Sequence, residues 1–280
     1  MDLLSEETLY RQYMEFFELA ERRRRWSVFD DIPWDKWQEQ SRDESLAQCA
    51  ETFLGVEMYL PDYVAEGLNV VRESFGQAWF QVNWGYEESK HALALKEFLL
   101  RSGQRTEEQV REFERKVLSR RWTMPFATPR RMFVYGAIQE KTTWMSYRQQ
   151  LNRARELGDP VMAEICRYIA RDEAAHADFY RRTLQACLQE DYEGTLKDIA
   201  HVVKEFKMPA YDLLPDYDKR LAVMQVIGID REVFFRDVLM PTLKKVGVSR
   251  RDLVRARGQL RREGQEHLER GDRREHGEDE

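Results

Sequence analysis

Long apolar runs are missing from this 280-residue sequence. No stretch approaches the roughly 18 to 20 residues that a membrane-spanning helix needs. The N-terminus has no basic segment followed by an apolar one, so we expect no secretory signal. Cysteine is scarce, and three widely spaced residues predict neither a disulfide framework nor a zinc site, which makes a reducing cytoplasm the expected compartment. Glycine-rich phosphate loops are absent as well, which excludes the two common nucleotide-binding fingerprints.

Proline and glycine are also scarce, at 8 and 14 residues, and they gather at a few points. The segments between them show long helical patterns with little β-branched alternation, so we predict an all-α protein. The chain is 34% charged but 12% aromatic, which indicates a folded core under a charged surface. The formal net charge of -6 argues against a dedicated nucleic-acid partner.

The helical patterns predict one domain over residues 1–249. A bundle is expected at about 42–190, between an N-terminal helix with its connector (1–41) and short C-terminal helices (191–249). The long helices are predicted at 42–72, with an interruption near Gly55 and Pro61, and at 74–101, 130–157 and 161–189. The segment 102–129 is too long for a tight turn and fits a crossover with its own helix. Residues 250–280 are rich in arginine and acids and predict a flexible tail.

One short motif, Glu-x-x-His, occurs twice on strongly helical segments. The first copy is Glu88-Ser89-Lys90-His91 and the second is Glu173-Ala174-Ala175-His176. On an α-helix, positions i and i+3 lie on the same face, so each copy offers a carboxylate and an imidazole to one point beside the helix. That pair of ligands suits a transition metal such as iron. Both copies have apolar neighbours at core spacing, and charged pairs that face a core are costly unless they bind a partner.

Two isolated acids complete a regular pattern. Glu57 and Glu140 stand in apolar or aromatic surroundings, each about thirty residues before one Glu-x-x-His copy. The order Glu, Glu-x-x-His, Glu, Glu-x-x-His is that of two helical hairpins with the same ligand set, which is how ferritin-like four-helix bundles build a site for two metal ions. The predicted fold is therefore such a bundle with additional flanking helices.

The wording of these motifs resembles the soluble acyl-ACP desaturases. EESKH and DEAAH stand where that family has EENRH and DEKRH or close variants, and LPDY, QEKTTW and MPA also match, over roughly residues 40–215. Met58 and Tyr59, the ADFY after the second motif and the tail depart from the family text. The resemblance implies a homodimer with a non-haem di-iron centre. It also implies an enzyme that uses O2 and electrons from ferredoxin to desaturate an acyl chain on acyl carrier protein.

The resemblance also implies residue roles. Two iron ions would be held by six ligands: Glu57, Glu88, His91, Glu140, Glu173 and His176. Thr143 falls where the family has a threonine on the oxygen side of the cluster. Asp172 corresponds to an acid that hydrogen-bonds a ligand histidine, and Trp84 corresponds to a tryptophan of the same network.

Two further groups are candidates for substrate contact. Phe133 and Gly136, on the helix that carries Glu140, could wall a narrow apolar channel. An acyl carrier protein is acidic, so its docking surface should be locally basic. The candidates for that surface are Arg22, Arg23, Arg24 and Arg25 in one run, and Lys204 and Lys207 in another.

Other functions remain open at this stage. A ribonucleotide reductase small subunit uses the same ligand logic but needs a tyrosine one turn after the first histidine, where this chain has Leu95. Another di-iron oxygenase, such as a hydroxylase or an N-oxygenase acting on a carrier-bound or free substrate, is the enzymatic alternative. A non-catalytic protein that binds metal or an acyl carrier on the same bundle is the third. Manganese accepts these ligands as well as iron does.

Overall fold

The structure, a computed structural model, describes residues 6–260 and 262. That part of the chain contains helices and no strand, which confirms the all-α prediction. The helices are α1 (Glu6–Leu19), η1 (Ala20–Arg24), η2 (Trp34–Lys36), η3 (Glu39–Ser41), α2 (Glu44–Glu57), α3 (Leu60–Val71), α4 (Phe75–Arg101), α5 (Glu107–Leu118), α6 (Pro129–Glu156), α7 (Pro160–Glu190), α8 (Tyr192–Glu205), α9 (Tyr217–Val226), α10 (Arg231–Val233), η4 (Phe234–Leu239) and α11 (Met240–Lys245).

Local sequence signals set most of the helix ends. Thr106 begins α5 with a capping box, in which its hydroxyl accepts from the Gln109 amide and the Gln109 side chain accepts from the Thr106 amide. Asp159 caps α7, where Pro160 takes the first helical position that tolerates a missing N–H. Gly158 lies in the connection between α6 and α7. Its φ of 66° is a conformation that favours glycine.

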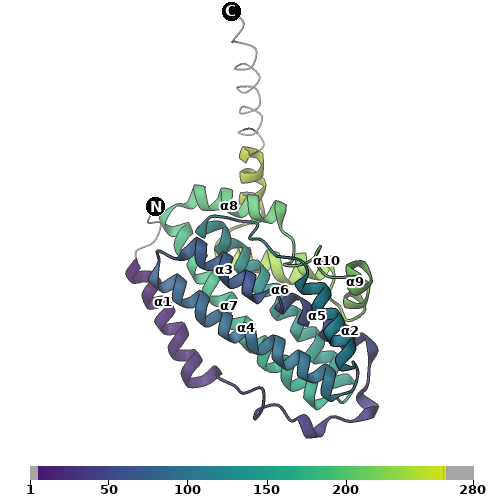
Figure 1. The fold of residues 1–280 in the computed structure, drawn as a ribbon. Coiled ribbons are helices and arrows are strands. Elements are labelled where there is room, and N and C mark those ends of the chain that lie inside the picture. Colours follow the sequence, from purple (N-terminus) through teal and green to yellow (C-terminus); the bar gives the residue numbers. More distant parts are fainter. Residues whose placement is uncertain (1–5, 261, 263–280) are drawn as a thin grey trace, which may run out of the picture.

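Four helices, α2, α4, α6 and α7, form the central bundle (Figure 1). Helices α6 and α7 are joined by a short turn and lie against each other along their length. Helix α2 packs on α4 and α6, and α4 packs on α7. The crossover between the two hairpins carries α5, as the sequence predicts, and α5 lies against α2. This is the ferritin-like arrangement that the ligand order predicts.

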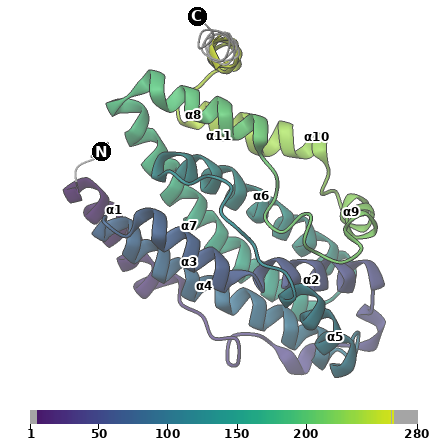
Figure 2. The same ribbon diagram turned by 45° about the horizontal axis from the view of Figure 1, so that its top comes forward.

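The remaining helices cover the outside of the bundle (Figure 2). Helix α1 lies along α4 and also contacts α7, while α3 packs on α4 and α6. Gly76 allows the close crossing of α1, because a Cβ there would lie 2.5 Å from the Leu9 backbone. Helix α8 runs beside α6 and α7, α9 rests on α2, and η4 and α11 rest on α6.

The buried apolar residues form two clusters that meet a polar layer in the middle of the long helices. On α4, Phe80 and Trp84 belong to one cluster, and Leu95 and Phe98 belong to the other. On α7, the same division separates Phe179 and later residues from Ile169 and earlier ones. The segments between, 87–91 on α4 and 172–176 on α7, hold the Glu-x-x-His motifs. The bundle therefore buries the carboxylates and imidazoles of both motifs in one layer.

The first part of the predicted flexible tail forms a helix. Residues 250–260 are helical, and Leu253 and Ala256 are buried against the core cluster that contains α8. Leu253, Ala256 and the partly buried Leu260 give this charged helix one apolar face at helical spacing. The remaining part of the predicted tail lies outside the described residues, apart from Arg262, and the single-domain boundary at 249 stays a prediction. In the described part, no helix is both long and apolar enough to cross a bilayer.

Candidate metal centre

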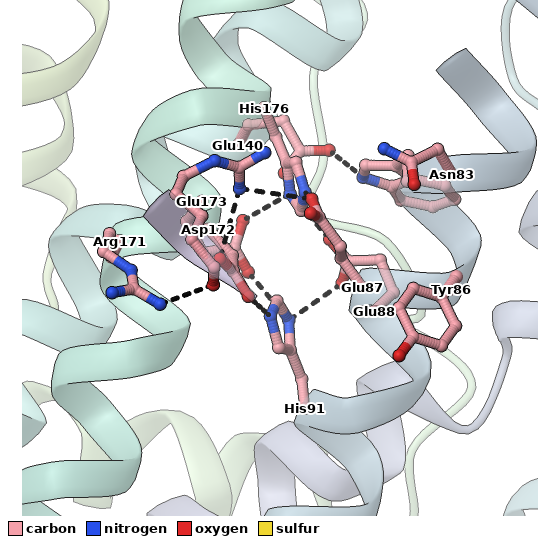
Figure 3. Close-up of polar contacts among 12 residues, drawn as sticks. Asn83, Tyr86, Glu87, Glu88, His91, Glu140, Arg171, Asp172, Glu173 and His176 are labelled. Atoms are coloured by element: carbon pink, nitrogen blue, oxygen red, sulfur yellow. Dashed lines mark hydrogen bonds and ion pairs between the residues drawn. The ribbon is translucent and has the colours of Figure 1, made fainter. Parts of the chain in front are cut away.

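The six residues of the predicted ligand set meet inside the bundle. Figure 3 shows Glu88, His91, Glu140, Glu173 and His176 pointing toward one another. The six residues come from all four central helices, which contribute Glu57 (α2), Glu88 and His91 (α4), Glu140 (α6), and Glu173 and His176 (α7). None of these side chains belongs to a residue that is more than 4% exposed. The i, i+3 spacing works as expected on both α4 and α7, because each Glu and His pair points to the same side of its helix.

The six residues form two overlapping groups of four. Glu57, Glu88, His91 and Glu173 make one group, and Glu88, Glu140, Glu173 and His176 make the other. In each group the nitrogen and oxygen ligand atoms lie within 4.8 Å of one another. Glu88 and Glu173 belong to both groups. The arrangement therefore offers the ligands of a buried metal site.

Unpartnered atoms at the centre fit metal binding. The structure leaves buried atoms without a hydrogen bond on Glu88 (Oε1), His91 (both ring nitrogens), Glu140 (Oε2), Glu173 (both oxygens) and His176 (Nδ1). Several of these atoms face one another: His91 Nδ1 lies 3.5 Å from Glu173 Oε1, and His176 Nδ1 lies 3.0 Å from Glu88 Oε1. Buried polar atoms without partners are costly. Cations bound between them would remove that cost, and Glu and neutral His are ligands that iron and manganese accept.

Each histidine faces an acid that stands just before the other motif. Glu87 Oε2 forms a hydrogen bond of 2.8 Å with His176 Nε2, and this bond fixes the ring so that Nδ1 faces the centre. Asp172 Oδ2 makes a longer contact of 3.5 Å with His91 Nε2. The sequence argument named Asp172 and missed Glu87. The signal was present, because Glu87 precedes Glu88 as Asp172 precedes Glu173.

Two arginines and a tryptophan complete this outer network. Arg24 Nη1 contacts Glu87 Oε2 at 3.2 Å and Asp172 Oδ1 at 3.1 Å, so one guanidinium joins the two outer acids. Arg25 Nη1 contacts Glu87 Oε1 at 2.9 Å. The Trp26 indole donates to Asp172 Oδ2 at 2.7 Å. The last residue of η1 and the residue after it therefore supply the countercharge for acids that would otherwise be buried alone.

This network corrects the predicted docking run at 22–25. Arg24 is buried in the outer network, and Arg25 is held by Glu87 and Glu21, so neither is free to meet a partner protein. Arg22 and Arg23 remain exposed on η1. The sequence pattern shows four adjacent charges, but the wide turn of η1 directs them to different sides.

Each lone glutamate accepts a hydrogen bond from an aromatic side chain. The Trp84 indole donates to Glu140 Oε1 at 3.0 Å, as its predicted place in the network requires. The Tyr147 hydroxyl donates to Glu57 Oε1 at 3.0 Å, a contact that the sequence argument missed. Thr143 is buried beside the centre and bonds the backbone oxygens of Gln139 and Glu140.

The charges of the centre strongly shift its proton equilibria. Burial, reinforced by the charge of Glu88, raises the pKa of Glu57 and of Glu173 well above the usual carboxyl range. Burial would raise the pKa of Glu88 too, but the two neighbouring histidines outweigh it and lower that pKa. Burial disfavours the charged form of both histidines, yet the surrounding carboxylates raise the pKa of each well above its usual value.

Two cavities approach the centre. A small one of about 50 Å³ lies beside the carboxylates of Glu57, Glu88 and Glu140, and its other lining residues include Thr143, Gly136 and Tyr180. A larger, mostly apolar one of about 470 Å³ lies between α2, α6 and the C-terminal segments. Val56 and Pro209 line both cavities.

The predicted substrate residues divide between these spaces. Gly136 lines the small cavity and leaves room for the Tyr180 ring, which would lie 2.8 Å from a Cβ at that position. Phe133 instead lines a separate cavity near the start of α6. Lys204 and Lys207 line the large cavity, at the end of α8, where both are exposed.

Comparisons with known proteins agree with this geometry. The profile of the family described as "Fatty acid desaturase" matches residues 56–274. A Mycobacterium tuberculosis protein named as an acyl-[acyl-carrier-protein] desaturase, DesA1, is 25% identical over 250 residues, covering 81% of this chain and 72% of the relative. The chloroplastic stearoyl-[acyl-carrier-protein] 9-desaturase of Elaeis guineensis var. tenera is 28% identical over 167 residues, which cover 56% of this chain and 42% of that protein.

Solved structures show the same fold. That of the acyl-ACP desaturase DesA2 from M. tuberculosis H37Rv has a TM-score of 0.67 at 17% identity, covering 90% of this chain and 96% of that one. An R2-like ligand-binding oxidase with a Mn/Fe cofactor has a TM-score of 0.52 at 15% identity, covering 89% of this chain and 91% of that one. At these identities the similarity establishes the ferritin-like fold alone.

Proposed function

This chain belongs to the fatty acid desaturase family, and on that ground we propose that it is an O2-dependent di-iron desaturase. Its substrate would be a fatty acyl chain carried on acyl carrier protein, with electrons supplied by ferredoxin. The observation that carries the proposal is the pair of overlapping four-residue groups that share Glu88 and Glu173 inside a buried site. A saturated C–H bond is inert to acid–base chemistry, and two bound irons with O2 would supply the oxidising power to remove its hydrogen.

The side chains of the protein would hold the ions, orient the histidine rings and enclose the substrate. Glu57 and Glu140 would each be a ligand of one ion, while Glu87 and Asp172 hold the histidine rings with Nδ1 toward the centre. The aromatic and aliphatic walls of the small cavity exclude water and bring a chain segment against the carboxylates. Thr143 lines that space, and its hydroxyl bond to the Gln139 backbone oxygen holds the side chain against the α6 wall beside the carboxylates.

The cavities suggest a path for the acyl chain. We propose that the chain enters through the large apolar cavity and reaches the centre past Val56 and Pro209, which line both spaces. Lys204, Lys207 and Arg231 line the large cavity. These cations suit the acidic carrier protein and the phosphate that links it to the chain. Arg22 and Arg23 stay weaker candidates for docking, because they lie on η1, away from the end of α8 (Figure 2).

We also propose a homodimer and a cytoplasmic location. The outer face of α4 exposes large apolar side chains at helical spacing, and α1 adds two more beside them. About half of each α4 side chain is accessible in Phe75, Trp79, Val82, Tyr86 and Leu93, and Tyr10 and Met14 of α1 are 40% exposed. A contiguous apolar stripe of this kind is typical of a protein interface. The three cysteines are buried and free, which suits a reducing compartment.

Metal content and product mass test the proposal together. The protein is reconstituted with ferrous iron and incubated with acyl carrier proteins that bear chains of several lengths, ferredoxin, a reductase and O2. We expect two irons per chain and products two mass units lighter than their substrates. Products that gain oxygen would instead identify a hydroxylase or N-oxygenase, and absence of O2-dependent turnover with bound iron would identify a non-catalytic protein. His176→Ala and Glu173→Ala should bind less than half of the wild-type iron.

A further inference from the structure

Tyr147 has surroundings unlike those of the other buried tyrosines near the centre. Its hydroxyl donates to Glu57 Oε1, a carboxylate oxygen of the metal centre, at 3.0 Å. The other four donate to neutral oxygens, which have almost no affinity for a proton: Tyr59 to Val117 O, Tyr63 to Val56 O, Tyr135 to Lys207 O and Tyr180 to the Gln81 amide oxygen. Only a carboxylate among these acceptors can take up the phenolic proton.

The Tyr147 side chain is also close to the centre and closed to solvent. It is fully buried, with the Phe53 ring 4.9 Å and the His91 ring 6.4 Å from its own, centroid to centroid. It lines neither the small cavity beside the carboxylates nor the large apolar cavity. An oxidised form of this ring would therefore be shielded from water, and the Phe53 ring, which lines the large cavity, packs against it.

Burial decides how such a ring can be oxidised. Removal of an electron alone would leave a positively charged ring out of contact with water, which is disfavoured. Removal of the electron together with the proton leaves a neutral ring, and the hydrogen bond to Glu57 already provides the path for that proton. The hydroxyl already contacts Glu57 at 3.0 Å and the ring lies 6.4 Å from that of His91, so an electron could pass to ions held by these residues without movement of the chain.

We propose that Tyr147 is a redox-active residue that gives one electron to the O2-oxidised metal pair and its phenolic proton to Glu57. The O–H bond breaks and a neutral phenoxyl radical remains on Tyr147. The metal pair is reduced by one electron. An external one-electron donor reverses the step when the proton returns from Glu57. Tyr147 thus stores an oxidising equivalent when no substrate is bound. Tyr147 lies on α6. The position one helical turn after His91, where a ribonucleotide reductase small subunit needs a tyrosine, is Leu95 in this chain. The proposal rests on the di-iron function.

Electron paramagnetic resonance after O2 exposure tests this role. The full chain is loaded with ferrous iron without O2, its iron is measured, and O2 is added without substrate or electron donor. Samples are frozen from milliseconds to minutes. We expect an organic radical whose spectrum narrows when the protein contains ring-deuterated tyrosine and whose power saturation shows a nearby metal. Tyr147→Phe should lower its yield at least tenfold. Tyr59→Phe, which removes an equally buried hydroxyl, should leave the yield within twofold.

The outcomes separate this inference from the proposed function. An undiminished radical in Tyr147→Phe, or no radical in iron-loaded wild-type protein that consumes O2, overturns the redox role and leaves the desaturase proposal standing. Failure of the wild-type protein to bind iron overturns both. The deuteration and saturation measurements use wild-type protein, so the test does not depend on the variant folding.

Discussion

Glu87 shows how one side chain at the centre depends on several others. It contacts the His176 ring at 2.8 Å and two arginines at 2.9 and 3.2 Å, all in the buried polar layer. We expect Glu87→Gln to weaken binding of ferrous iron by about 10- to 100-fold, because the amide holds the ring less firmly and no longer balances Arg24. Metal titration followed by absorbance measures the change. Glu21→Gln, which removes only an exposed partner of Arg25, is the control.

Gly136 offers a test of packing beside the small cavity. A Cβ at this position would lie 2.8 Å from the Tyr180 ring, so we expect Gly136→Ala to lower the free energy of unfolding by about 1 to 3 kcal/mol. Gly258→Ala is a matched control, because nothing lies within 4 Å of its Cβ and alanine favours the helix there. Urea denaturation measures the free energy of unfolding of both variants. Equal free energies for Gly136→Ala and Gly258→Ala would contradict the packing argument.

At the residue scale, sequence reasoning finds charges better than it finds their partners. The six centre residues share a readable period and order, and the structure brings them together. Glu87 escaped because a second acid in EESKH looks like a surface residue, and Tyr147 escaped because its contact with Glu57 joins residues 90 positions apart. Arg24 was placed on the surface for the same reason, since its acids lie on α4 and α7.

One buried arginine ties helix α9 to the bundle, beside apolar contacts such as that of Met224. Arg220 donates to Thr52 Oγ1 at 3.1 Å and to the Pro215 carbonyl at 2.9 Å, and it pairs with Glu51 at 2.9 Å. We expect Arg220→Met to cost about 3 kcal/mol, since it leaves Glu51 with fewer buried partners. Hydrogen exchange should rise selectively in residues 217–226. Lys219→Met, at an exposed position, should change neither the stability nor the exchange. Equal hydrogen exchange of residues 217–226 in the two variants would contradict the proposed role of Arg220.

Element positions follow from sequence to a useful degree. The long helices and the crossover helix appear where proline, glycine and capping residues predict them, because those signals are local. The helix at 250–260 was missed because its stability comes from Leu253 and Ala256 docking on the bundle, against a composition that favours solvent. The wide turn of η1 was missed as well, since its reason is the tertiary pairing of Arg24.

For the whole molecule, the polar layer predicts a pH dependence of stability without metal. The folded-state pKa values of His91 and His176 are raised above 6.5, so their stabilisation is complete below that pH and is lost as the pH rises through the raised values. The raised pKa values of Glu57 and Glu173 act in the same direction. We expect the Tm of chelator-treated protein to fall between pH 6.5 and 9, and that of iron-loaded protein to fall less. Scanning calorimetry measures these Tm values. A Tm of the chelator-treated protein that stays constant or rises between pH 6.5 and 9 would contradict the prediction.

The apolar stripe on α4 predicts the assembly state. A double change, Trp79→Glu with Val82→Glu, places two charges in the proposed interface and should convert a dimer to a monomer, since unpaired charges oppose burial. Light scattering after size exclusion measures the mass. Val226→Glu, on α9 and 77% exposed, should leave the dimer intact. A wild-type monomer, or a dimer that survives the double change, would place any interface elsewhere.

The reciprocal placement of the two outer acids has a consequence for assembly. The first hairpin carries His91, but its ring is steadied by Asp172 of the second; the second carries His176, steadied by Glu87 of the first. Each four-residue group also takes ligands from both hairpins. Neither half can therefore form a complete ion site, and ion binding is linked thermodynamically to the docking of the halves. Occupancy should then report on native association of the two hairpins, so that a chain with separated halves would be recognisable by its empty centre.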